Sequence, residues 1–178
     1  LANNSQELSL LMDTLMTFSR MEADGPSAQF EIVKLREIWT CLEMMTQRLI
    51  RERPIQFGIH VESATDTIES DGQKLQQILV QLLTNALKFT EKGKIDLSIR
   101  EISEGGGEFL EIAVADTGIG IKREDQDVIF EDFRQLDGSS TRHYGGTGLG
   151  LGLCRKVASA LGGGIRLSGV VGVGSGIK

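Results

Sequence analysis

Cysteine and proline are scarce in this chain, which has two residues of each among its 178. Two cysteines cannot build the dense disulfide framework that small secreted domains use in place of a large core. Cys41 and Cys154 both lie in apolar, helix-like surroundings. They are predicted to be small buried residues of a reduced, cytoplasmic protein.

Long hydrophobic runs are also lacking, and no stretch is apolar over enough residues to span a bilayer. No charged leader followed by an apolar segment opens the chain, so no secretory signal is visible. Because the first residue is not methionine, we expect the chain to be a fragment of a longer protein. Whether that longer protein is anchored in a membrane is left open.

An excess of basic residues is missing as well, since the net charge is −6. An acidic domain repels phosphate backbones, which argues against nucleic acid as a partner. Hydrophobic residues make up 40% of the chain, which is enough for a globular core. The length suits one domain with an additional element.

The first part of the chain predicts one long helix over residues 5–21. An apolar seam at heptad spacing runs along it, formed by Leu8, Leu11, Leu15 and Phe18. The helix should end near Glu22, because the sequence Ala-Asp-Gly-Pro follows. The seam fits either a helix docked on its own domain or one helix of a bundle that another segment or chain completes. We expect residues 1–24 and 25–178 to form separate units.

The second unit begins with a short strand predicted at residues 30–33. The next helix has one apolar face, made of Leu35, Ile38, Leu42, Met45 and Leu49, and ends before Pro54. Alternation over residues 55–61 predicts a half-buried strand. Asp71 suits the N-cap of a long helix that runs through Ala86.

Alternation over residues 95–99 and 110–114, with glycines at 105–107 between them, predicts an antiparallel hairpin. Residues 134–148 are polar and glycine-rich, as in a mobile functional loop. A helix is expected over residues 149–161 and a strand over 165–167. Helices and strands mix without strict alternation, so the predicted fold is an α/β (α+β) sandwich with a mixed sheet packed on helices.

Three polar residues follow one another at one-turn spacing on the otherwise apolar helix after Asp71: Gln81, Asn85 and Lys88. Amide oxygens suit Mg²⁺, and a lysine one turn on can balance phosphate charge. A solvated helix face is the simpler alternative. It is weakened because Asn85 lies among leucines and an alanine.

Asp116 ends a predicted buried strand, and Gly118 and Gly120 follow it. A carboxylate there can accept a hydrogen bond from an exocyclic amine, and the glycines permit close approach by a flat ring. Asp-Thr-Gly is also found in aspartic proteases. We disfavour that alternative because long helices flank the triplet here.

Glycines alternate at Gly146, Gly148 and Gly150 where a helix is expected to begin. Backbone N–H groups and the helix dipole at such a point favour an anion. A Rossmann turn would need a strand directly before the glycines, and a polar loop precedes them instead. A Walker loop needs Gly-Lys-Ser/Thr, which the chain lacks.

In order along the chain, residues 85–90, 116–121, 129–133 and 145–151 resemble the N, first glycine, phenylalanine and second glycine boxes of sensor histidine kinases. The resemblance spans about residues 30–176, and residues 15–25 are similar to the end of the second dimerisation helix of that family. Four ordered boxes are far more specific than any one of them.

The resemblance implies a Bergerat ATP-binding fold in which Asn85 holds Mg²⁺, Lys88 meets phosphate and Asp116 reads the adenine amine. It also implies further nucleotide-binding positions, at Phe89, Gly118, Gly120, Ile121, Phe130, Phe133, Tyr144, Gly146, Thr147, Gly148, Leu149 and Gly150. Implied partners are histidine-bearing dimerisation helices, a response regulator receiver domain and a second copy of the full-length kinase.

Two departures from the family pattern stand out. Gln81 replaces the usual first asparagine, so its binding of Mg²⁺ is open; it cannot act as the general base of water-activating relatives. Neither His60 nor His143 lies in a helix that resembles the acceptor segment. We therefore expect a protein-histidine kinase domain that does not phosphorylate itself alone. The alternative is a pseudokinase module that binds nucleotide without transfer.

Overall fold

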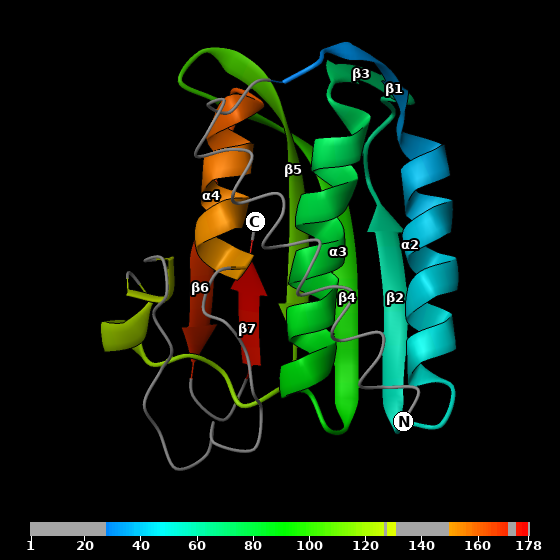
Figure 1. Cartoon of the computed structure of the whole chain (residues 1–178), viewed down its shortest axis with the longest axis vertical. Coiled ribbons are helices and arrows are strands. Elements are labelled where there is room, and N and C mark those ends of the chain that lie inside the picture. Colours follow the sequence, from blue (N-terminus) through cyan, green and yellow to red (C-terminus); the bar gives the residue numbers. More distant parts are fainter. Residues whose placement is uncertain (1–27, 127, 131–149, 171–173, 178) are drawn as a thin grey trace.

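The computed structural model describes residues 28–126, 128–130, 150–170 and 174–177. A five-stranded sheet with the order β2-β4-β5-β7-β6 forms one layer, and the helices α2, α3 and α4 cover one of its faces (Figure 1). A small two-stranded sheet, β1-β3, lies at one end. The described elements are β1 (Glu31–Lys34), α2 (Leu35–Ile50), β2 (Ile55–Val61), β3 (Thr67–Ser70), α3 (Gly72–Phe89), β4 (Gly93–Glu104), β5 (Gly107–Asp116), η1 (Arg123–Asp125), η2 (Val128–Phe130), α4 (Gly150–Ala160), β6 (Leu167–Val170) and β7 (Gly174–Ile177).

The central helix α3 starts where the sequence predicts. The carboxylate of Asp71 accepts a hydrogen bond from the backbone N–H of Lys74 at 3.0 Å, which satisfies one of the free amides of the first turn. Burial disfavours the charged carboxylate, but hydrogen bonds from Lys74 and Gln29 and the Lys74 charge outweigh it. The pKa of Asp71 is therefore lowered. The cap thus holds a buried charge in place.

The predicted hairpin forms the spine of the sheet. β4 and β5 pair antiparallel, with Ile95 opposite Asp116 at one end, and Gly105 and Gly106 turn the chain at the other with φ of 62° and 83°. β2 pairs parallel with β4, so the chain crosses over through α3 between them. Core side chains from both layers are buried between the sheet and the helices; those that are fully buried include Leu42, Leu83, Ile95, Leu97 and Ile99.

The predicted α/β sandwich with a mixed sheet is confirmed, but some local predictions are wrong. Leu49 is 40% exposed, and Ile50 completes the buried face of α2 in its place. Cys41 is exposed, whereas Cys154 is buried as predicted. β1 begins one residue later than expected, and the last predicted strand is displaced from residues 165–167 to Leu167–Val170.

The expected helix over residues 5–21 and the expected loop over residues 134–148 lie outside the described residues. Within the described part of the chain, no helix combines the length and the apolar character needed to cross a membrane. The boundary between residues 24 and 25 stays a prediction.

Candidate functional site

Three elements that carry predicted site residues converge at one end of the sheet. In Figure 1 the C-terminal ends of α3 and β5 lie in the lower half of the molecule, and α4 begins at its own lower end, beside the middle of α3. α3 packs against both α4 and β5. Residues about 30 positions apart in the sequence are thereby brought to a common region.

The carboxylate of Asp116 is held on both oxygens. Oδ1 accepts a hydrogen bond from the backbone N–H of Gly118 at 2.8 Å, and Oδ2 accepts one from the hydroxyl of Ser175. Asp116 and Ser175 face one another in the register of β5 and β7. The side chain is half-buried. It therefore has a defined orientation and still has lone pairs for an external donor.

The loop after Asp116 has no space for a side chain at its first glycine. A Cβ atom on Gly118 would collide with the carbonyl oxygen of Phe89, the last residue of α3. The N–H of Ile119 donates to that same oxygen at 3.3 Å. Gly120 has φ of 69°, which favours glycine. The first glycine box is thus tied directly to the end of the N-box helix.

The polar stripe of α3 meets the beginning of α4 at Gln81. Nε2 of Gln81 lies 3.4 Å from Oδ1 of Asn85, and a Cβ atom on Gly150 would collide with the Gln81 amide. Gly150 therefore permits the close approach of α4 to this amide pair. The ammonium of Lys88, one turn on, lies 5.2 Å from the centroid of the Phe89 ring. Both amide side chains are half-buried.

Phe130 is buried at 6% exposure, and the Arg155 guanidinium stacks on its ring at 4.1 Å from the centroid. This contact joins η2 to α4. Ile121 is half-buried beyond the glycine loop. The other predicted site residues lie outside the described residues: Phe133, Tyr144, Gly146, Thr147, Gly148 and Leu149.

His60 is exposed on β2, where its Nε2 lies 2.9 Å from Oδ1 of Asp96. His60 thus lies on the strand predicted over residues 55–61, and its side chain is exposed. Lys94 also pairs with Asp96 at 2.9 Å. The pKa of Asp96 is lowered, because its hydrogen bonds to Lys94 and His60 outweigh partial burial. His60 thus belongs to a surface group of polar side chains around Asp96.

Sequence reasoning missed Ser175 and Gly174. Gly174 has φ of 131°, and a Cβ atom there would collide with the carbonyl oxygen of Asp116. Close pairing of β7 with the end of β5 is therefore what brings the Ser175 hydroxyl to the carboxylate. In the sequence, the alternation of Gly172, Gly174 and Gly176 is the one feature that could have indicated close backbone pairing here.

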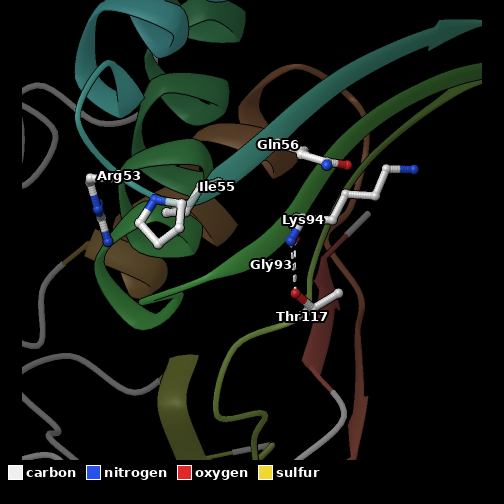
Figure 2. A pocket seen from close by; sticks show the side chains of 7 residues that line it. Arg53, Ile55, Gln56, Gly93, Lys94 and Thr117 are labelled. Carbon is white, nitrogen blue, oxygen red and sulfur yellow. Dashed lines mark hydrogen bonds between the residues drawn. The ribbon is translucent and has the colours of Figure 1, made fainter.

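A shallow groove of about 530 Å³ borders the site at Thr117. Figure 2 shows it between the start of β2 and the start of β4, with Arg53, Gln56 and Lys94 around it. The Lys94 N–H donates to the Thr117 hydroxyl at 2.9 Å. Thr117, which follows Asp116 in the sequence, is one of the residues that line the groove, but none of the predicted site residues does so. It is therefore distinct from the convergence of α3, β5 and α4.

Among the described residues, no group of three or more histidine, cysteine or acidic side chains could hold a metal ion. Among the described residues at the convergence of α3, β5 and α4, Asn85 offers an amide oxygen that could contact a cation. Such a ligand suits a hard cation such as Mg²⁺ far better than zinc or copper.

Comparison with known proteins shows the family of this chain. Residues 70–178 match the family described as histidine kinase-, DNA gyrase B-, and HSP90-like ATPase. The autoinducer 2 sensor kinase/phosphatase LuxQ of Vibrio cholerae is 33% identical over 176 residues, which are 98% of this chain and 20% of that protein. The signal transduction histidine-protein kinase BarA of Escherichia coli is 32% identical over 166 residues, 92% of this chain and 18% of that protein.

Among solved structures, full-length ShkA in complex with AMPPNP superposes with a TM-score of 0.81 at 29% identity, over 99% of this chain and 35% of that one. The chain spans about a fifth of the length of these curated relatives. With a family match over more than half of its residues and a fold shared with sensor histidine kinases, the chain belongs to the histidine kinase-, DNA gyrase B- and HSP90-like ATPases of the Bergerat fold.

Proposed function

We propose that this chain is the ATP-binding catalytic domain of a two-component sensor histidine kinase. It binds ATP with Mg²⁺ and transfers the γ-phosphate to a histidine on a separate helical segment, for relay to a receiver aspartate. The observation that carries the proposal is the fixed carboxylate of Asp116, held by Gly118 and Ser175 beside the end of the N-box helix.

Asp116 has the chemistry to select adenine. Its two oxygens are oriented by donors of the chain, and a remaining lone pair accepts from the exocyclic amine of the base. A 6-oxo purine presents an acceptor there instead, so it would face the carboxylate unpaired. Gly118 serves this arrangement because a Cβ there would collide with the carbonyl oxygen of Phe89, so the glycine lets the loop after Asp116 pack closely on the end of α3.

The amide oxygen of Asn85 suits a magnesium ion, which it would hold through Oδ1. Gln81 directs its Nε2 toward that oxygen at 3.4 Å, so it would join the ligands only after its amide group turns over. The ion supplies charge neutralisation on the phosphates. Lys88 adds a positive charge one turn on, and the start of α4 at Gly150 offers backbone N–H groups. Phosphoryl transfer depends mainly on such positioning and electrostatics.

Partners follow from the reaction. A phosphoryl group moves from ATP to an imidazole only when the acceptor is held in line, which calls for the histidine-bearing dimerisation helices of a kinase dimer. ThkA, which shares the fold, is solved in complex with the response regulator protein TrrA. A receiver domain is thus the proposed partner of the longer protein, with the catalytic domain in the cytoplasm.

A transfer assay tests the function. We would incubate the chain with γ-labelled ATP and Mg²⁺, alone and with a helical hairpin that carries an acceptor histidine. We expect acid-labile label on the hairpin alone, and its loss in Asn85→Ala. Label on this chain by itself would contradict the missing-acceptor interpretation. ATP binding without transfer to any acceptor hairpin would favour the pseudokinase alternative.

A further inference from the structure

Arg53 connects the loop after α2 to the end of the N-box helix. Its Nη2 donates to the carbonyl oxygen of Leu87 at 2.7 Å and to that of Thr90 at 2.6 Å. Figure 2 shows Arg53 beside the groove, at the start of β2. One guanidinium nitrogen thus bridges two carbonyls from 34 and 37 positions further along the chain.

Leu87 lies in the last turn of α3 and Thr90 is its C-cap, positions at which carbonyls have no partner within the helix. Leu87 is 5% exposed and Thr90 is fully buried, so water has little access around them. The negative end of the helix dipole also favours a cation at this position. Arg53 therefore satisfies groups that would otherwise be costly to bury.

The carbonyl of Phe89, between these two acceptors in the sequence, has a different partner. It accepts from the N–H of Ile119 in the first glycine loop. The end of α3 is thereby held from two sides, by Arg53 and by the loop that follows Asp116. Lys88 lies within this four-residue stretch.

Arg53 is itself held in place by its backbone. Its N–H donates to the carbonyl of Ile50 at 2.8 Å, and its carbonyl accepts from Ile55 at 2.8 Å. The next residue, Pro54, accepts from Gly93 at 2.9 Å. The guanidinium therefore projects from a segment anchored to α2, β2 and the start of β4.

We propose that Arg53 is a positioning residue for the nucleotide site. It fixes the last turn of α3, so that Lys88 and the Phe89 carbonyl stay in register with the loop of Gly118 and Ile119. The inference deepens the proposed nucleotide-binding function and rests on it. Without the guanidinium, the last turn loosens, and the hydrogen bond between Phe89 and Ile119 opens more often.

Arg53→Met tests this, because it keeps most of the aliphatic stem and removes the donor. Arg51→Met is the matched control, an exposed arginine two residues earlier. We would measure ADP affinity by calorimetry and amide exchange of Ile119 in the nucleotide-free chain, at a temperature where every variant is folded. Amides of the β4–β5 hairpin report global opening.

In Arg53→Met we expect ADP affinity to fall about tenfold, a size typical of coupling between sites. Ile119 exchange should accelerate while the hairpin amides keep their rates. Arg53→Lys should recover part of the ADP affinity and part of the slow exchange at Ile119, since one ammonium can donate to two carbonyls. Arg51→Met should change neither.

Unchanged ADP affinity and unchanged Ile119 exchange in folded Arg53→Met would overturn the inference. Equal acceleration at Ile119 and in the hairpin would also overturn it, because it would show a general effect on stability. If Arg53→Met does not fold, Arg53→Gln, which removes the charge and shortens the reach of the donor, is measured in its place against the same outcomes. If the unsubstituted chain does not bind ADP, the proposed function fails. The amide exchange of Ile119 then still tests whether Arg53 holds the end of α3.

Discussion

Replacing Asp116 by asparagine should weaken nucleotide binding while leaving the fold intact. The asparagine oxygen can still accept from the Gly118 N–H, which lies 2.8 Å from Oδ1. Its amide nitrogen then faces the Ser175 hydroxyl, which can rotate to accept rather than donate. The free energy of unfolding should therefore fall by less than about 1 kcal/mol.

The effect on ADP should be much larger. The bound adenine amine loses a charged acceptor, and a lost hydrogen bond to a charged group costs about 2 kcal/mol. That cost corresponds to roughly 30-fold weaker binding. Discrimination between ADP and inosine diphosphate should also narrow, because the amide nitrogen can donate to a 6-oxo group.

Calorimetry with ADP and with inosine diphosphate, together with urea unfolding, measures these changes. Asp66→Asn is the matched control, an exposed aspartate just before β3, at the far end of the molecule in Figure 1. Undiminished ADP binding by Asp116→Asn would refute the adenine assignment. If Asp116→Asn lowers the free energy of unfolding by as much as it weakens the free energy of ADP binding, the claim that the carboxylate acts on the base is refuted.

Three further substitutions or reactions test the fold and the site. Gly118→Ala should lower the free energy of unfolding by about 1–3 kcal/mol and weaken ADP binding, because the new Cβ collides with the Phe89 carbonyl; Gly164→Ala, with open space around it, is the control. Asp71→Ala should cost about 1 kcal/mol at pH 7 in urea unfolding. Because the pKa of Asp71 is lowered in the fold, its contribution is full above about pH 4 and is lost as the pH falls through the folded pKa, so the variant and the unsubstituted chain should converge in acid. A thiol reagent at pH 8 should modify exposed Cys41 quickly, whereas burial raises the pKa of Cys154 to about 12 and should leave it unreacted until denaturant is added; two fast thiols would contradict the buried position.

The sequence by itself determined the elements whose signals are local. The period of α3 and its Asp71 cap place that helix, because a 3.6-residue repeat and a side-chain cap act within one stretch of chain. The β4–β5 hairpin follows from alternation on either side of a glycine turn. The ordered motifs also predict which residues meet a nucleotide, with Asn85 and Asp116 as the main examples.

Only the tertiary structure decided how those residues are held. Ser175 reaches Asp116 from 59 positions away, and Arg53 reaches the end of α3 from 37, so neither contact leaves a pattern in the neighbouring sequence. β3 and β7 are short and pair with strands distant along the chain, which local alternation does not reveal. Exposure of Cys41 likewise depends on which side of α2 the sheet covers. Long-range pairing and burial are properties of the assembled layers, and no single segment encodes them.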